Sequence, residues 1–186
     1  APPEPAQTPA AQTATRYHAN IRWTSYGVPH IPANDWGGLG YGFAYAVATD
    51  GVCILAREFV VVRGEQSKFF GAEEGRREAD IFHKAIITQE ALADAAERAP
   101  REMRALQAGY IAGYNRYLAD HSGDKLPASC RNQPWVRPID ATDIARMAIG
   151  VGIRYGVGRA QTAIANAAPP NVEVKTTFVA PAAERL

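Results

Sequence analysis

The chain has 186 residues, of which 47% are hydrophobic and 21% are charged, enough for one compact domain. Its 20 basic and 19 acidic residues leave a net charge of +1, which argues against binding to a nucleic-acid backbone or an anionic membrane. No stretch approaches the roughly 18 consecutive apolar residues of a transmembrane helix, so no membrane span is expected.

Residues 1–15 are rich in Pro, Ala, Gln and Thr and show no apolar periodicity, which predicts a flexible leader. The numbered chain starts at Ala1 and not at Met. Such a start, followed by such a leader, is typical of a protein whose signal peptide has been removed. We therefore expect a periplasmic or secreted protein; the alternative is a chain simply trimmed at this position.

The first regular structure is expected between residues 20 and 33. Polar and apolar residues alternate over 20–26, the period of a β-strand, and an extended stretch resumes at 28–31 after Gly27. Pro29 has no N–H to donate to a central ladder, so the second arm is predicted to be an edge strand or the return of a hairpin.

A glycine-rich helix is predicted after the hairpin. Asn34 and Asp35 are candidate N-caps for it. Four of the six residues 37–42 are glycine, and each would weaken an isolated helix by roughly 1 kcal/mol relative to Ala. These glycines are therefore expected to permit close backbone packing. Residues 51–63 are largely apolar and predict a helix buried on most sides.

A second long helix is predicted over 100–120, and the proline-rich stretch 124–139 is expected to be a loop. Large apolar residues recur along the helix at steps of three and four, and such a stripe is more often core than ligand site. The stripe consists of Met103, Leu106, Tyr110, Tyr114 and Tyr117.

A third helix is predicted to open at Asp140 and Asp143, whose spacing resembles a capping box. Its apolar face contains Ile144, Met147, Val151 and Tyr155. Four glycines at 150, 152, 156 and 158 then predict that the helix bends or breaks. A broken helix presents side chains to a cavity, so Arg154 and Tyr155 are candidates to orient a carbonyl or cap an apolar pocket. The alternative is a bent helix with an exposed arginine.

No complete catalytic or metal site can be assembled from this sequence. It has no G-x-S-x-G elbow, its four histidines show neither i,i+4 pairing nor an H-E-x-x-H motif, and its two cysteines do not form C-x-x-C. The glycine clusters are not nucleotide loops, because the third glycine of G-x-G-x-x-G would fall at Phe43 or Tyr155. An even cysteine count permits one disulfide, between Cys53 and Cys130, but two buried thiols remain an alternative.

Several short segments, taken together in their order and spacing, resemble the penicillin acylase family over residues 19–168. Within that family, residues 130–137 and 156–158 look most like the acyl-homoserine lactone acylases. The matching segments are Tyr-Gly-Val-Pro-His-Ile at 26–31, Gly-Leu-Gly-Tyr-Gly-Phe-Ala-Tyr-Ala at 38–46, Leu-Ala-Arg-Glu at 55–58, Arg-Gly-Glu at 63–65, Phe-Phe-Gly at 69–71 and Gly-Tyr-Ile-Ala-Gly-Tyr-Asn-Arg-Tyr at 109–117.

The resemblance implies the fold and the chemistry. Members are N-terminal nucleophile hydrolases, exported as a precursor that cuts itself into two chains. The larger beta subunit begins with the catalytic serine, whose α-amino group acts as general base. This sequence resembles the smaller, alpha subunit, so no catalytic residue is expected on it. The implied fold class is α+β, with this chain as the mainly helical half of an αββα sandwich.

The resemblance also implies roles for individual residues. Val151, Arg154 and Tyr155 match pocket and gating positions of the acylases, and the small Gly152, like Gly150 beside it, would leave room for an acyl chain. Where calcium-binding members carry a glutamate ligand, this chain has Gln161, a poorer calcium ligand, so no cofactor is expected. Cys53 and Cys130 resemble a cysteine pair of the lactone acylases, which favours the disulfide.

Three domain segments are expected: a leader at 1–15, the alpha-subunit domain at 16–168, and a C-terminal tail near a processing site at 169–186. The expected function is hydrolysis of the amide bond of N-acyl-homoserine lactones, small-molecule substrates, in complex with the beta subunit. Two alternatives remain: a β-lactam acylase on the same scaffold, and a non-catalytic secreted helical interaction module. Only the last predicts a soluble, isolated monomer.

Overall fold

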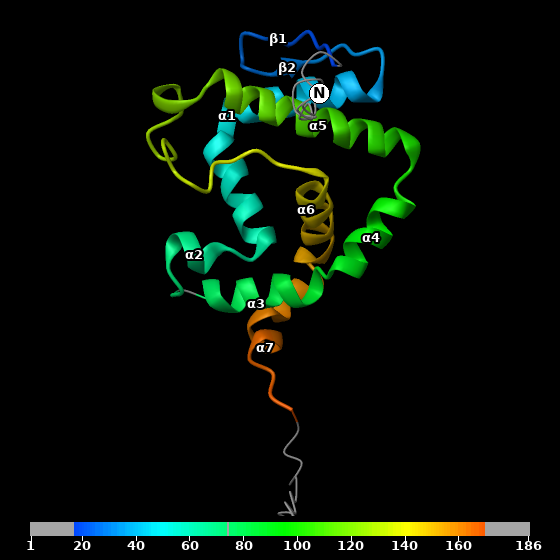
Figure 1. Ribbon diagram of the computed structural model, residues 1–186. Coiled ribbons are helices and arrows are strands. Elements are labelled where there is room, and N and C mark those ends of the chain that lie inside the picture. The colour runs from blue at the N-terminus through cyan, green and yellow to red at the C-terminus, as the bar shows by residue number, and fades with distance from the viewer. Residues whose placement is uncertain (1–16, 74, 170–186) are drawn as a thin grey trace, which may run out of the picture.

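The computed structural model describes residues 17–73 and 75–169. The predicted leader at 1–15 and all of the predicted tail except residue 169 therefore lie outside the described residues. Within the described part, the chain forms a layered assembly of helices with a short hairpin at one end (Figure 1). None of these helices combines the length and the apolar composition needed to cross a lipid bilayer.

The hairpin is formed by β1 (Arg22–Trp23) and β2 (Pro29–His30). The strands are antiparallel, with Arg22 opposite His30 and Trp23 opposite Pro29. Gly27 adopts a positive φ of 77° in the connecting turn, and the Thr24 amide donates to the Val28 carbonyl at 3.0 Å. This confirms the predicted hairpin. Each strand has only two residues, so the β content of the described chain is small.

The predicted glycine-rich helix and the predicted buried helix form one element, α1 (Trp36–Arg63). The Asp35 carboxylate caps it by accepting a hydrogen bond from the Gly38 amide at 2.7 Å. Gly51 has non-helical backbone angles, so the helix kinks there, and its second half runs in a new direction toward α2 (Figure 1). The helix ends at Gly64, which is left-handed with φ 65° and donates back to carbonyls of the last turn.

The glycines of α1 pack directly against α5 (Arg101–Asp120). A Cβ atom on Gly40 would collide with the Leu106 carbonyl of α5. In the reverse direction, a Cβ on Gly109 would meet the Gly37 carbonyl and one on Gly113 would meet the Tyr41 carbonyl. The two backbones therefore touch, which is the close packing that the glycine cluster predicts.

Three helices between α1 and α5 have no counterpart in the sequence analysis: α2 (Gln66–Phe70), α3 (Arg76–Ile86) and α4 (Gln89–Arg98). They are short and polar on their outer faces. Asp80 of α3 is buried because its carboxylate accepts the amides of Gln66 and Ser67, at 2.8 and 2.7 Å, and so caps α2. In Figure 1, α2 and α3 lie in the lower part of the fold, and α4 runs up its right-hand side toward α5.

The C-terminal part begins with the short 3₁₀ turn η2 (Gly123–Lys125) and a loop. Then follow α6 (Ala141–Arg154), the 3₁₀ turn η3 (Val157–Ala160) and α7 (Gln161–Ala165). The predicted break of the third helix is confirmed: α6 stops at Arg154, and the chain re-forms helix only after the glycines at 156 and 158.

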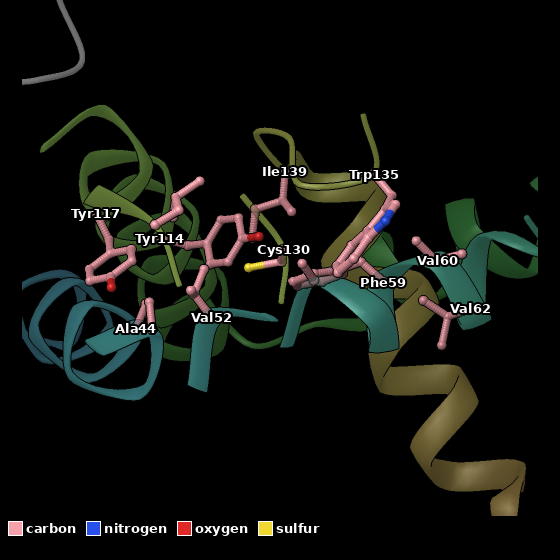
Figure 2. Packing of buried hydrophobic residues seen from close by; sticks show 13 residues of the cluster. Ala44, Val52, Phe59, Val60, Val62, Tyr114, Tyr117, Cys130, Trp135 and Ile139 are labelled. Atoms are coloured by element: carbon pink, nitrogen blue, oxygen red, sulfur yellow. The ribbon is translucent and has the colours of Figure 1, made fainter. Parts of the chain in front are cut away.

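The core lies where α1, α5 and the loop at 126–139 meet. Tyr114 is fully buried and its ring packs edge-to-face on Phe59, with centroids 5.6 Å apart. The loop contributes buried Cys130, Trp135 and Ile139 to the same cluster (Figure 2). Cys53 and Cys130 form a disulfide with Cα atoms 5.4 Å apart, which decides between the two cysteine alternatives and fastens the loop to α1.

The aromatic stripe on α5 is core only over part of its length. Tyr114 and Tyr117 are buried, but Met103 at the other end is 45% exposed. The prediction that the stripe is core is therefore wrong at its N-terminal end, where Met103 is exposed. The mainly helical character is confirmed. The β-sheets of an αββα sandwich are not part of the described residues, which contain the one hairpin.

Candidate functional site: an apolar groove between three helices

The position of α6 is set by its N-terminus. The side chains of Asp140 and Asp143 each accept the other's backbone amide, at 3.0 and 3.1 Å, forming the predicted capping box. Asp143 also receives two hydrogen bonds from Arg63 at the end of α1, at 2.6 and 2.5 Å. Although burial acts to lower it, the hydrogen bonds and charge of Asp143 raise the pKa of the Arg63 guanidinium. This buried pair fixes α6 against α1.

An apolar groove of about 360 Å³ lies between α1, α5 and α6. Its sides come from the exposed end of the α5 stripe and from the face of α6 that the sequence analysis identified. Phe59 of α1, 1% exposed, contributes to it from the core. The groove is lined by Phe59, Met103, Leu106, Gln107, Tyr110, Ile144, Met147, Ala148 and Val151.

The groove is suited to binding an apolar chain. Its described lining is mostly apolar, with the Gln107 amide and the Tyr110 phenol as its polar side-chain groups. Burial raises the pKa of the Tyr110 phenol, which keeps that wall uncharged. Val151 lies at the rim and is 54% exposed. The sequence analysis did not identify Phe59 or the groove residues of α5 as site residues. An apolar stripe on a helix can be buried core or can line a groove, and the sequence does not distinguish the two.

The other predicted site residues do not meet in this groove. Arg154 lies on a different cavity, where its Nη2 donates to the Glu58 carboxylate at 2.7 Å. Tyr155 caps the end of α6 and is 76% exposed. A Cβ on Gly152 would have no atom within 4 Å, so this glycine faces open space.

Gly150 has a packing role. A Cβ at this position would come within 2.8 Å of Val62 Cγ1, so the missing side chain lets α6 approach α1. The expectation that Gly150 and Gly152 leave room for an acyl chain stays a prediction.

The described residues contain no cluster of three or more histidine, cysteine, aspartate or glutamate side chains that could hold a metal ion. Gln161, at the start of α7, faces the same cavity as Arg154 and Glu58. Among the described residues that line this cavity, Glu58 is the one carboxylate beside the Gln161 amide. That carboxylate is already paired with Arg154.

A family model described as penicillin amidase matches residues 18–178 of this chain, nearly the whole described fold. The chain belongs to the penicillin amidase family.

Similar proteins of the penicillin amidase family carry acylase names. The chain is 42% identical over 175 residues to the acyl-homoserine lactone acylase PvdQ of Pseudomonas syringae pv. tomato, covering 91% of this chain and 22% of that protein. It is 37% identical over 167 residues to the aculeacin-A acylase of Actinoplanes utahensis, covering 83% of this chain and 21% of that protein. The chain thus spans about a fifth of the length of the relatives that it matches.

The fold agrees with this assignment. A thermostable penicillin G acylase from Alcaligenes faecalis superposes with a TM-score of 0.66, covering 76% of this chain and 75% of that chain. The sequence identity between the two is 24%, so the comparison is one of fold. Together with the family match, it confirms the resemblance drawn from the short motifs.

Proposed function

We propose that this chain is the alpha subunit of a two-chain acylase that hydrolyses the amide bond of N-acyl-homoserine lactones. The products are a fatty acid and homoserine lactone. The nucleophile in this scheme is the N-terminal serine of a separate, larger beta subunit. The observation that carries the proposal is an open groove whose described lining is mostly apolar, in a chain of the penicillin amidase family.

The groove supports a role in holding the acyl chain. Transfer of each CH₂ group of a fatty acyl chain from water to an apolar groove is favourable by about 0.8 kcal/mol. An apolar groove can therefore bind such a chain without polar contacts. Val151, at the rim, is placed to limit how long a chain enters. In the same proposal, Arg154, Tyr155 and Gly152 lie at the end of α6, where they contact the substrate or shape the entrance.

The exposed apolar surface supports the proposal that a larger chain binds here. A soluble domain of this size rarely exposes many large apolar side chains together. Here they occur on the hairpin, on both halves of α1 and on α6. They include Trp23, Tyr26, Val28, Trp36, Phe43, Ile54, Val151 and Tyr155, each more than two-fifths exposed.

In the proposed assembly, the beta subunit covers this surface. The hairpin joins its sheets, which complete the αββα sandwich.

The disulfide between Cys53 and Cys130 is typical of proteins that fold outside the reducing cytosol, which supports a periplasmic or secreted location. The proposal includes no metal, because Gln161 offers a neutral amide where a carboxylate would bind calcium better.

A second candidate is an acylase of the same kind that acts on β-lactam side chains or on other N-acyl compounds, such as aculeacin A. The similarity to a protein named aculeacin-A acylase favours it, since that relative matches along 83% of this chain. The same groove would serve, and the amine half of the substrate would distinguish the two enzymes.

The test uses the complete protein, purified after expression from its full gene. Native mass spectrometry is expected to show this chain bound to a larger chain whose first residue is serine. The purified complex is expected to release homoserine lactone from N-acyl-homoserine lactones, and replacement of that serine by alanine is expected to abolish release. A single chain that folds as a closed monomer would contradict the proposal. A complex that cleaves only β-lactam side chains or other N-acyl compounds, such as aculeacin A, would support the second candidate.

A further inference from the structure

The three helices around the apolar groove are joined to one another in pairs. The glycines of α1 and α5 bring those two backbones into contact, and Arg63 of α1 bonds to Asp143 of α6. The remaining pair, α5 and α6, supplies every lining residue of the groove except Phe59. The spacing between α5 and α6 therefore sets the width of the groove.

Asn115 of α5 connects this helix to the chain segment that leads into α6. Its Nδ2 donates to the Ile139 carbonyl oxygen at 2.9 Å, and its Oδ1 accepts from the Ile139 amide at 2.9 Å. These are the hydrogen bonds that the Ile139 backbone makes among the described residues. Because a side-chain amide carries a donor and an acceptor in one plane, this double contact fixes both the distance and the orientation of the segment.

Ile139 transmits this contact to the groove wall. It is 4% exposed and belongs to the core, and the residue after it, Asp140, is the N-cap of α6. Ile144, the first groove-lining residue of α6, follows about one turn after that cap. In Figure 1 the loop enters α6 at the end of the helix that lies toward α5. Figure 2 shows Ile139 beside Tyr114, the neighbour of Asn115 in α5.

The removal of the Asn115 amide would change the position of α6. A buried backbone amide or carbonyl without a partner is unfavourable, so the loop before α6 would move until water reached the Ile139 backbone. The pair of Arg63 and Asp143 would still hold the first turn of α6 against α1. The helix would then turn about this ion pair, and its groove face would shift relative to α5.

We propose that Asn115 is a positioning residue for the acyl site. Its double hydrogen bond to Ile139 holds the α6 wall at the spacing from α5 that an extended acyl chain fills. Asn115 is not part of the groove lining, so it acts through α6 and not on the substrate. The effect grows with chain length, because each further CH₂ group packs between the two walls. This inference rests on the acyl-binding role proposed above for the groove and adds a residue that sets its selectivity.

The test compares kcat and KM of the complete, processed protein for N-tetradecanoyl and N-octanoyl homoserine lactone. Asn115→Leu keeps a side chain of similar shape and removes both hydrogen-bonding groups. The KM for the tetradecanoyl substrate is expected to rise about tenfold and that for the octanoyl substrate less than about threefold, while both kcat values stay within about twofold.

The matched control is Asn166→Leu. The Asn166 Nδ2 donates to the Thr162 carbonyl at 2.8 Å at the end of α7, outside the groove lining. This variant loses the same kind of side-chain amide, and both KM values are expected to stay unchanged.

A merely structural role of Asn115 would give a different pattern. A partly unfolded variant contains fewer active molecules, so kcat would fall equally for the two substrates and KM would not change. That pattern, or an equal rise in KM for both chain lengths, would overturn the proposal. Asn115→Asp is the second variant in case Asn115→Leu does not fold. It keeps the acceptor for the Ile139 amide but loses the donor, and unchanged chain-length selectivity in it would also overturn the proposal.

Calorimetric titration with tetradecanoate separates this inference from the proposed function. If the parent complex binds no tetradecanoate, the groove is not an acyl site and the proposed function fails. If the parent binds tetradecanoate and Asn115→Leu binds it equally tightly, the acyl site stands and Asn115 has no positioning role. A dissociation constant that rises about tenfold in Asn115→Leu and stays unchanged in Asn166→Leu supports both.

Discussion

Arg63 and Asp143 lie 80 residues apart in the sequence and form a two-pronged ion pair with side chains 9% and 10% exposed. The pair joins the last turn of α1 to the first turn of α6. Since α6 carries one wall of the apolar groove, this contact determines where that wall stands relative to α1 and α5.

Asp143→Asn is expected to lower the free energy of unfolding by about 3 kcal/mol. The substitution removes the charge that compensates a buried guanidinium, and breaking a buried pair from one side leaves the other charge uncompensated. Urea unfolding of the assembled protein measures the change. The control is Asp94→Asn, whose partner Arg98 is 79% exposed; there a loss below about 1 kcal/mol is expected. Equal losses would contradict the structural role of the buried pair.

Gly109→Ala is expected to destabilise the protein by about 1–3 kcal/mol, because the added methyl group meets the Gly37 carbonyl and pushes α5 away from α1. Gly152→Ala is the comparison. It adds the same atom to a helix where nothing lies within 4 Å, so the helix should gain about 0.5–1 kcal/mol. Thermal unfolding of the two variants should therefore move in opposite directions. A stable Gly109→Ala would show that the backbones of α1 and α5 do not touch.

The double variant Cys53→Ser with Cys130→Ser is expected to lose about 4 kcal/mol of stability. The bridge closes a loop of 77 residues, and the chain-entropy model assigns roughly that value to a loop of this length. Reducing agent should lower the melting temperature of the parent and leave that of the double variant unchanged. If the parent is unfolded, reduced and refolded and its melting temperature does not change, the bridge contributes no stability.

Tyr114→Phe is expected to leave stability at pH 8 unchanged or to raise it by up to about 1 kcal/mol. The Tyr114 hydroxyl is buried and has no hydrogen-bond partner among the described residues, so its removal exposes no orphaned group. Urea unfolding at fixed pH measures this effect. Tyr26→Phe, at a position 93% exposed, is the control and should change nothing.

Burial also raises the pKa of the Tyr114 phenol above its usual value of 10.0. Because the folded-state pKa lies above the unfolded one, this group adds no pH dependence to the stability below pH 10, and the stability falls as pH rises further because the unfolded chain ionises first. Above pH 10, the parent should therefore lose about 1.4 kcal/mol more per pH unit than Tyr114→Phe. Parallel profiles for the two proteins between pH 9 and 11 would contradict the burial of this hydroxyl.

Val151→Trp is expected to reduce turnover of long-chain N-acyl substrates at least tenfold relative to short-chain ones. The larger side chain at the rim occupies the volume into which the end of a long chain would extend. The ratio of kcat/KM for a long and a short acyl chain is the measurement. Ala96→Trp, at an exposed site of α4 outside the groove lining, should leave that ratio unchanged. An unaltered ratio in Val151→Trp would remove this residue from the acyl site.

The sequence alone determined the local features. The hairpin, the long helices, the capping box at Asp140 and the helix break after Arg154 depend on residues that are neighbours in the chain, and turn, cap and periodicity rules apply there. The glycines of α1 were also correctly interpreted as packing positions. The family, too, was readable from short motifs in order.

The tertiary structure decided which apolar residues are buried and which remain open. Met103 and Tyr114 lie on the same stripe of α5, yet Met103 lines the groove beside α6, whereas Tyr114 packs on Phe59 of α1 in the core. Periodicity identifies a helix face but carries no information about what stands opposite it. The bridge between Cys53 and Cys130, the pairing of Arg63 with Asp143 and the double hydrogen bond between Asn115 and Ile139 likewise depend on contacts between distant segments, which only the folded chain brings together.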